Sequence, residues 1–438
     1  MLFYVAGFLT GSVVLFLLAF PPIGVLLALM ARPVVDATWN HPIVGNLRWT
    51  EVISVVVPVE ILLFMALGAK LRQSVKRLPL LNIWCLNLSA TFISFCLITI
   101  AQGPTAAFSV FFRQINGFVG YYMGQAFFLE DKGLRKFLLA LVMAGLFPLA
   151  IGLYQLVTGT QWIQAEAEGL TRYVGLYHDA FTIRYYMEQL ILATILYSAI
   201  FGNRRVVLNF ALAVLGICAV IVMFKAYSKS GMLTLAAWVA VWAILGRKFL
   251  FLGFVTIGLL AIGIYYLPEI SRQLQQLFHK EIGAIEGNIE LERTLAGRWY
   301  GWKEVWTSWN EIGVFGKTFG SGLVATGVHN DYLMLLLHGG LFAVMSYLAL
   351  LFTVGYKLMG YARKNRTPLA LGGVMAFCMW MIDSIGLVPS AYPGYQWFVW
   401  GIIGICLRRA QEESVRQKEG IAKEAVREQP LVDLKGAT

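Results

Sequence analysis

The sequence contains little charge for its length. Charged residues make up 13% of its 438 residues, whereas about 25% is usual for a soluble protein. Hydrophobic residues account for 58%, and the mean hydropathy is +0.69. This composition excludes an ordinary soluble protein, and no stretch resembles a separate soluble domain.

Several chemical motifs are also missing. The chain has no G-x-x-x-x-G-K-[ST], G-x-S-x-G or H-E-x-x-H sequence, and its outward-facing acidic residues do not show metal-ligand spacing. We therefore expect neither a metal nor a cofactor. The acidic residues of the long loops are expected to be solvated: Glu166, Glu168, Glu286, Glu290 and Glu292.

Other absences bear on compartment and partners. The first apolar run lacks a basic start and an A-x-A-like cleavage site, so we expect a retained helix rather than a signal peptide. The net charge of +11 does not imply nucleic acid, because the basic residues follow the membrane topology. The five cysteines form no C-x-x-C pair, lie in apolar segments and are expected to be small buried side chains: Cys85, Cys96, Cys218, Cys378 and Cys406.

Apolar runs of roughly 20 residues, the length that crosses a bilayer, recur along the chain. They predict an all-α polytopic membrane protein with about twelve transmembrane helices in a single domain, residues 1–407. The first span contains Pro21-Pro22, so it is expected to be kinked or re-entrant. The predicted spans are residues 4–30, 51–69, 79–101, 106–129, 137–157, 183–201, 206–224, 231–246, 249–267, 333–356, 368–388 and 395–407.

Basic residues alternate between the loops and predict the orientation. The loop after the second span and the polar tail, residues 408–438, are rich in Lys and Arg, and the positive-inside rule places them in the cytoplasm. Both termini are then cytoplasmic. The loops 158–182 and 268–332 are outside, and the second, between spans nine and ten, is unusually large. For a bacterium this means the inner membrane with a periplasmic active face.

Some cations lie on the outer side, where the positive-inside rule disfavours them. Arg113 lies within a span, and a charge at that depth is a functional-site candidate. Clustered cations there suit a lipid-linked phosphate or pyrophosphate. The candidates are Arg113, Arg172, Arg184, Lys229, Arg293 and Arg298.

These cations also have simpler explanations. Arg184 and Glu188 are spaced i,i+4 on one helix and can pair with each other. The intramembrane acids Glu60 and Asp383 could neutralise Arg113, and Lys225 could extend its amine to the membrane surface.

The large loop carries aromatic residues and a histidine. Trp299, Trp302, Trp306 and Trp309 form one stripe of an amphipathic helix, which is expected to lie in the headgroup region, and sugar stacking is a second reading. His329 precedes Asn330 and Asp331, either of which can cap the next helix, and its imidazole can act as a general base. His178 in the smaller loop is a further candidate.

The motifs together resemble the bacterial O-antigen polymerase and ligase superfamily, which includes Wzy-type polymerases and lipid A-core ligases. The resemblance covers most of the chain and is best from about residue 206 to 345. It rests on an S-[RK]-S-G turn at 228–231, Gly297-Arg298 before the Trp-rich helix, G-x-G at 320–322, the His329-Asn330-Asp331 run and Gly339-Gly340. Arg172 and Gly175, with His178-Asp179 after them, fit the earlier outer loop.

The resemblance implies inverting, metal-independent glycosyl transfer from an undecaprenyl-pyrophosphate-linked glycan. His329 would be the general base, and Arg298 and Lys229 would stabilise the pyrophosphate, although Lys229 stands where the family usually has arginine. The other expected substrate-binding residues are Arg113, Arg172, His178, Arg184, Arg293, Asn330 and Asp331.

Several functions share this chemistry and differ in the acceptor. A polymerase of O-antigen or exopolysaccharide takes a second lipid-linked glycan, a ligase takes lipid A-core, and a protein O-oligosaccharyltransferase takes a protein. The expected partners are these substrates, the phospholipid bilayer and other polysaccharide-export proteins, with no nucleic acid. A transporter or flippase for such glycans is the alternative from another class, although we find no internal repeat of the kind transporters often carry.

Overall fold

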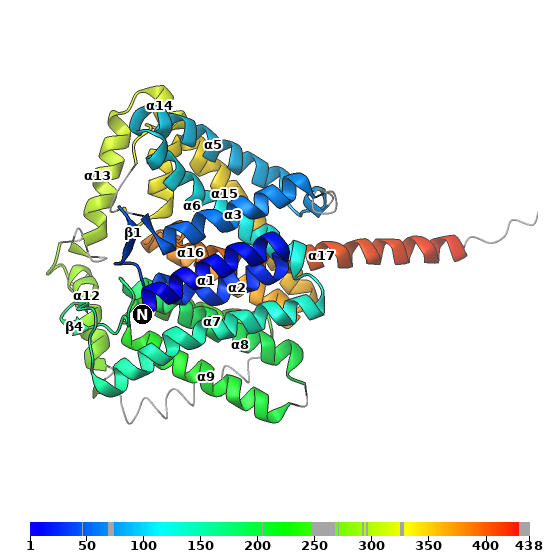
Figure 1. Ribbon diagram of the computed structural model, residues 1–438, viewed down its shortest axis with the longest axis horizontal. Helices are drawn as coiled ribbons and strands as arrows, with labels where there is room; N and C mark the ends of the chain where they lie inside the picture. Colours follow the sequence, from blue (N-terminus) through cyan, green and yellow to red (C-terminus); the bar gives the residue numbers. More distant parts are fainter. Residues whose placement is uncertain are drawn as a thin grey trace, which may run out of the picture.

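The computed structural model describes residues 1–45, 47–68, 74–203, 205–247, 268–269, 271–290, 293–294, 297–324 and 328–428. Regular structure in these segments is almost entirely helical (Figure 1). The only strands in this described part form two short antiparallel hairpins, β1 (Pro42–Val44) with β2 (Leu47–Arg48) and β3 (Glu166–Ala167) with β4 (Leu170–Thr171). The prediction of an all-α protein is confirmed.

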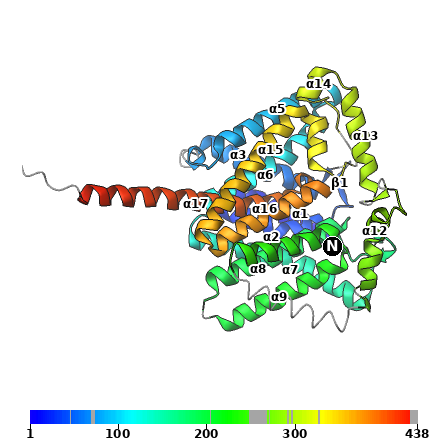
Figure 2. The same ribbon diagram turned by 180° about the vertical axis from the view of Figure 1, so that it is seen from behind.

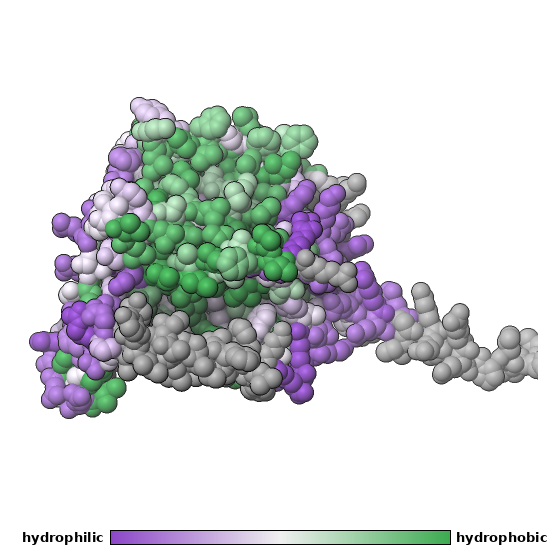
Figure 3. Space-filling view, turned by 90° about the horizontal axis from the view of Figure 1, so that it is seen from below, coloured by the Kyte–Doolittle hydropathy of each residue, from purple (hydrophilic) through white to green (hydrophobic). Residues whose placement is uncertain are grey.

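Seven described helices are long and apolar enough to cross a membrane. A shorter apolar helix is α10 (Lys229–Ile244), and the predicted ninth span, residues 249–267, lies outside the described residues. Figure 3 shows a broad hydrophobic surface between hydrophilic ends, as a multi-pass membrane protein requires. The seven are α1 (Leu2–Ala19), α3 (Trp49–Leu67), α5 (Leu81–Gln102), α7 (Asp131–Thr158), α9 (Val206–Lys225), α15 (Asp331–Asn365) and α16 (Pro368–Gly386).

More polar helices occupy the interior. Most residues of α8 (Ala180–Phe201) are buried, whereas its neighbour α9 is strongly apolar and has only four buried residues among 20. In α6 (Pro104–Phe127), a Cβ on Gly124 would lie 2.4 Å from the carbonyl oxygen of Gly401 in α17 (Pro393–Glu428). Glycine therefore lets these two backbones touch, which is typical of helix packing in membranes.

The first predicted span is two helices rather than one. After α1, the chain turns at Phe20, and Pro21 begins α2 (Pro21–Asp36), which packs against α1. Proline lacks a backbone N–H and has a fixed φ, so it favours the first turn of a new helix over the middle of an old one. The long apolar run 4–30 therefore folds as a helical hairpin.

This hairpin changes the expected position of the N-terminus. Phe3 contacts His41 and Trp49, beside the β1–β2 hairpin. In Figures 1 and 2 the N-terminus lies at the end of the bundle that carries α12 (His279–Ile285) and α13 (Arg298–Glu311), whereas α17 leaves from the other end. Within the described residues, the N-terminus and the far end of α17 therefore lie at opposite ends of the bundle, and the cytoplasmic placement of both termini stays a prediction.

The outer end of the bundle is covered by short elements. In Figures 1 and 2, α13 runs across the ends of the long helices, and α14 (Val314–Phe319) follows it. The 3₁₀ helix η3 (Pro389–Ala391) separates α16 from α17. At the opposite end, α17 extends to Glu428, so the polar tail begins as a continuation of that helix.

Candidate functional site

A cavity of about 1100 Å³ lies at the end of the bundle that α12 and α13 cover. Its lining comes from segments far apart in the sequence, including α6, α8, α10, α12 and η3 with its flanks. Five of the predicted site residues line it together: Arg113, Arg172, Lys229, Arg298 and His329.

The S-K-S-G motif begins α10 at this cavity. Ser228 caps the helix by accepting a hydrogen bond from the backbone N–H of Gly231, at 3.5 Å. A Cβ on Gly231 would lie only 2.7 Å from Cδ of Arg184, so glycine allows α10 to pack against α8. The motif thus serves packing, and it leaves Lys229 facing the cavity from the first turn.

Arg298 is the first residue of α13, directly after Gly297 in the left-handed conformation at φ 75°. The helix packs through Val305 and Trp309 against the start of α15. Trp299 and Trp306 are more exposed, at 38% and 51%. The predicted helix is confirmed, but none of its tryptophans is among the described residues that line the cavity, so the cavity does not support sugar stacking.

The residues after His329 are structural. Asn330 caps α15 by accepting from the backbone N–H of Leu333 at 3.0 Å, and its amide donates to the carbonyl of Ile385 at 2.9 Å. Asp331 is buried and accepts from Ser390 Oγ at 2.6 Å. Both side chains help to fix the helix start beside His329, and neither is among the described residues that line the cavity, so their substrate-binding roles stay a prediction.

The glycines of the G-x-G and Gly-Gly motifs permit a close backbone crossing. Gly340 interrupts α15 at φ 63° and ψ −164°, and a Cβ there would lie 2.5 Å from the Thr318 backbone. Beside the break, the carbonyl of Leu337 accepts from both the backbone N–H and Oγ of Ser321, at 3.1 and 3.0 Å. The motif therefore shapes the loop that leads to His329 and does not itself line the cavity.

Three arginines of the cavity have no acidic partner in the part of the chain that the structure describes. Among the described residues, no carboxylate oxygen lies within 4.0 Å of a side-chain nitrogen of Arg113, Arg172 or Arg298. Burial lowers the pKa of Arg172, although Glu168 and Asp179 act to raise it. Burial also lowers the pKa of Arg298, and the charges of Arg172 and Arg184 lower it further. Such a cluster favours a bound anion.

His329 is suited to accept a proton. Burial lowers its pKa from the ordinary value, the positive charge of Arg298 lowers it further, and Asp179 acts in the opposite direction. The imidazole is therefore mostly neutral near pH 7 and can serve as a base.

Both lysines of the cavity have acidic partners that were not anticipated. Lys229 Nζ lies 2.7 Å from each carboxylate oxygen of Glu281, and Lys280 Nζ lies 2.9 Å from Glu168. The prediction that Glu168 is a solvated loop acid is wrong, because its side chain is only 12% exposed and ion-paired. Nothing local in the sequence indicates the contact between residues 229 and 281.

Arg184 belongs to a buried ion group rather than to the cavity. Its guanidinium lies 3.1 Å from Glu188 and 2.7 Å from Asp383, and all three side chains are 0% exposed. The simpler reading, in which Arg184 pairs with Glu188, holds. Asp383 neutralises Arg184 instead of Arg113, and Glu60 forms no ion pair with Arg113.

Two further candidates lie outside the cavity. Arg293 is exposed and is paired with Glu290 at 3.4 Å on the loop surface. His178 has a half-exposed side chain whose Nδ1 lies 3.0 Å from Asp179, and its ring packs against Trp39. Neither lines the cavity, so the predicted substrate-binding roles of both residues lack structural support.

Two further residues line the cavity: Asp179, which the outer-loop motif included without a role, and Tyr392, which sequence reasoning missed. The Tyr392 hydroxyl donates to Asp179 at 2.5 Å, and Asp179 caps α8 by accepting from the backbone N–H of Thr182 at 2.7 Å. An aspartate at the start of a helix is a recognisable capping signal. Tyr392 lies between two apolar helices and carries no such signal.

The described residues contain no group of three or more His, Cys, Asp or Glu side chains that could hold a metal ion. The polar lining can instead bind a polyanion through arginine and accept a proton at His329. No protein-family model matches the chain, and no curated protein matches it either.

Proposed function

We propose that the protein is a glycosyltransferase of the bacterial inner membrane that uses an undecaprenyl-pyrophosphate-linked glycan as donor. The observation that supports this proposal is that Arg113, Arg172 and Arg298 line one cavity together with His329, and none of the three is paired with a carboxylate of the described residues. A leaving pyrophosphate needs fixed positive charge, and an acceptor hydroxyl needs a base.

The proposed reaction is a single inverting displacement. The acceptor hydroxyl transfers its proton to His329 as its oxygen bonds to the anomeric carbon of the donor. The bond from that carbon to the pyrophosphate oxygen breaks, and the lipid pyrophosphate leaves with the electron pair. Arg298 and Arg172, whose charges act on each other across the cavity, stabilise the developing negative charge.

The orientation is part of the proposal. Arg409 pairs with Asp131 at 2.7 Å, and Arg408 donates to the carbonyl of Arg77, so basic residues gather at the end of the bundle opposite α12. The positive-inside rule makes that end cytoplasmic. The cavity, the large loop and the N-terminus are then periplasmic.

The distribution of charge favours an enzyme over a transporter. The Arg184 group lies deeper in the bundle, but its side chains are 0% exposed and do not line the cavity. The cations that do line the cavity lie at the end of the bundle that α12 and α13 cover, where a lipid-linked pyrophosphate would bind. The polymerase, ligase and protein O-oligosaccharyltransferase readings share this chemistry and differ in acceptor.

The test is a transfer assay with the purified protein in nanodiscs. An undecaprenyl-pyrophosphate glycan is supplied with a second lipid-linked glycan, lipid A-core or a protein acceptor, and glycosylated product and released undecaprenyl pyrophosphate are measured. Product with one acceptor supports the proposal and names the enzyme type. No transfer to any of the three, together with movement of the glycan lipid across a vesicle membrane, would support the transporter instead.

A cellular assay separates the readings independently. Loss of a polymerase leaves a single repeat unit on lipid A-core or removes long exopolysaccharide. Loss of a ligase leaves bare lipid A-core while lipid-linked polymer accumulates.

A further inference from the structure

One helical segment of the large loop lies along the cavity and is held there by polar contacts. We call residues 271–285, which include α12, the strap. Gln276 donates to the carbonyl of Glu168 at 3.0 Å, and Lys280 pairs with the carboxylate of the same residue at 2.9 Å. Tyr227 donates to Gln273 at 3.0 Å. The strap is therefore joined both to the β3–β4 hairpin and to the start of α10.

The ion pair between Lys229 and Glu281 is the contact nearest the proposed chemistry. Lys229 Nζ meets both oxygens of Glu281 at 2.7 Å and lies 5.1 Å from the centre of the Phe278 ring. The two charged side chains remain 27% and 22% exposed. A carboxylate from the strap thus occupies the position on Lys229 that a ligand phosphate would take.

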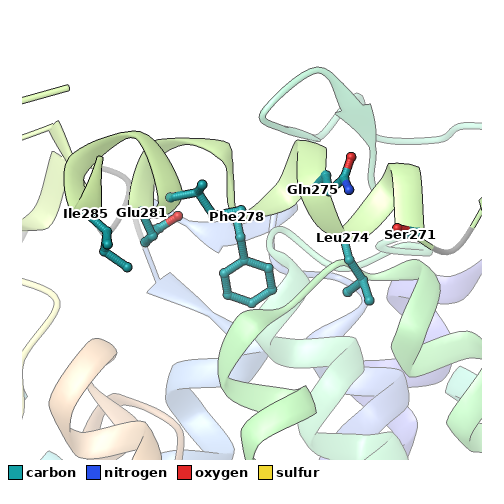
Figure 4. A pocket seen from close by; sticks show the side chains of 7 residues that line it. Ser271, Leu274, Gln275, Phe278, Glu281 and Ile285 are labelled. Carbon is teal, nitrogen blue, oxygen red and sulfur yellow. The ribbon is translucent and has the colours of Figure 1, made fainter. Parts of the chain in front are cut away.

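A second, apolar cavity of about 530 Å³ lies along the strap. Figure 4 shows Leu274, Phe278 and Ile285 projecting from the strap beside Glu281. Phe278 and Glu281 also line the charged cavity, so the two spaces meet at these residues. An apolar groove that continues into a cationic cavity matches a molecule with an apolar chain and an anionic head.

We propose that the strap binds the lipid part of an amphiphilic anion, with the chain in the apolar groove and the anion replacing Glu281 on Lys229. The inference rests on the proposed function for the identity of the ligand, a polyprenyl pyrophosphate. Beyond that function, the apolar groove would be the place where the lipid enters, and Glu281 would cover Lys229 until the anion binds.

The exchange is physically favourable. A partly exposed ion pair between two flexible side chains contributes little, so separating Lys229 from Glu281 costs little. A pyrophosphate carries more charge than a carboxylate and reaches Arg172 and Arg298 in the same cavity, which have no ion-pair partner among the described residues. Ile282 and Ile285, which are 41% and 87% exposed, would lose contact with water under the chain.

The proposal is tested by binding to the full-length protein in nanodiscs. The probes are undecaprenyl pyrophosphate and inorganic pyrophosphate, and the variants are Glu281→Gln, Lys229→Gln and the double variant. Because Glu281→Gln uncovers Lys229, it should tighten binding of both probes by roughly two- to fivefold. Lys229→Gln should weaken both, and the double variant should bind like Lys229→Gln, since no lysine is left to uncover.

The matched control is Glu290→Gln, which removes an equal charge from an ion pair in the same loop but outside the cavity. If Glu281→Gln binds inorganic pyrophosphate no better than Glu290→Gln does, the displacement is wrong.

The groove is tested separately with Ile282→Ser combined with Ile285→Ser, because both side chains are exposed and their loss should leave the fold intact. This variant should bind undecaprenyl pyrophosphate at least about threefold more weakly and inorganic pyrophosphate unchanged. Equal weakening of both probes would overturn the lipid assignment. So would unchanged binding with a changed oligomeric state, which would assign the groove to a contact between copies. If the wild-type protein shows the expected binding but no glycan transfer, glycosyl transfer fails and the strap proposal stands.

Discussion

Two groups of charged residues near the end of the helix bundle that α12 and α13 cover show opposite arrangements. Around Arg184, one cation meets Glu188 and Asp383 with all three side chains 0% exposed, and Tyr395 donates to Asp383 at 2.7 Å. In the cavity, Arg172 and Arg298 are near each other and have no carboxylate within 4.0 Å among the described residues. In the sequence, both groups are arginines in or beside apolar segments.

The comparison indicates which intramembrane charge is structural. A buried cation that is already neutralised by acids on other helices holds those helices together and has little capacity for a ligand. A cation that is near other cations and lacks an acid is unfavourable until an anion arrives. Four substitutions, in order of decreasing effect, separate these cases.

Removal of the Arg184 guanidinium should have the largest effect on stability. Arg184→Met leaves Glu188 and Asp383 buried without their cation, which costs about 3–5 kcal/mol when one partner of a buried pair is lost. We expect a large fall in the melting temperature of the purified protein and in its yield. Replacing the acids as well, with Glu188→Gln and Asp383→Asn, should restore much of this loss. A stable single variant would show that the group is not structural.

Substitution of His329 should remove transfer while leaving the fold intact. His329→Ala eliminates the proposed base, and general base catalysis contributes about 10²- to 10⁴-fold. Turnover in the nanodisc assay should fall by that factor with an unchanged melting temperature. His178→Ala is the control, because His178 lies outside the cavity. Full activity of the His329 variant would refute the base assignment.

The pH dependence of glycan transfer provides a second test of His329. Since burial and Arg298 lower the pKa of His329, its neutral form persists below the ordinary titration range near pH 6.5. Transfer should therefore be retained as the pH falls from 7 to 6.5 and decline only in more acidic solution. Because the positive charge of Arg298 contributes to the shift, Arg298→Gln should move the residual profile toward higher pH. If the pH profile of Arg298→Gln matched that of the wild-type protein, the charge of Arg298 would not influence the titration of His329.

Loss of Arg298 should impair transfer by less than loss of the base but by far more than loss of a surface cation. Removal of one group that stabilises developing charge typically costs about 10²- to 10³-fold in rate. Lys225→Ala is matched in charge, and Lys225 lies outside the cavity near Tyr227. Comparable rates for Arg298→Ala and Lys225→Ala would show that the unpaired arginines do not act on the leaving group.

Much of the architecture follows from local patterns, because apolar length, helix caps and proline positions are local properties. The helical class and the amphipathic helix at 298–311 were predicted in this way. Pro21-Pro22 predicted a kinked or re-entrant first span but could not decide between the two, since α1 and α2 are both apolar and a hairpin in lipid differs from one kinked helix only in how it packs.

For the site, too, the sequence predicted some features, whereas others depend on tertiary packing. The predicted converging cations were Arg113, Arg172, Arg184, Lys229 and Arg298, with His329 as the base. All of these except Arg184 line the cavity. The partners could not be predicted, because Glu281 reaches Lys229 across 52 residues and Asp383 reaches Arg184 across 199. Which cations are neutralised therefore depends on the tertiary fold.

Substitution of Arg293 should have the smallest effect, and it tests whether an arginine of the loop matters only when it lines the cavity. It is an outer-loop arginine close in sequence to Arg298, but its side chain is 71% exposed, and its contact with Glu290 is a surface pair. Arg293→Gln should change stability by less than about 0.5 kcal/mol, as for most exposed substitutions, and leave the transfer rate unchanged. Thermal unfolding and the nanodisc assay measure both quantities. A rate as low as that of Arg298→Gln would mean that positive charge in the loop matters irrespective of the cavity, and the distinction between paired and unpaired arginines would then lose its functional meaning.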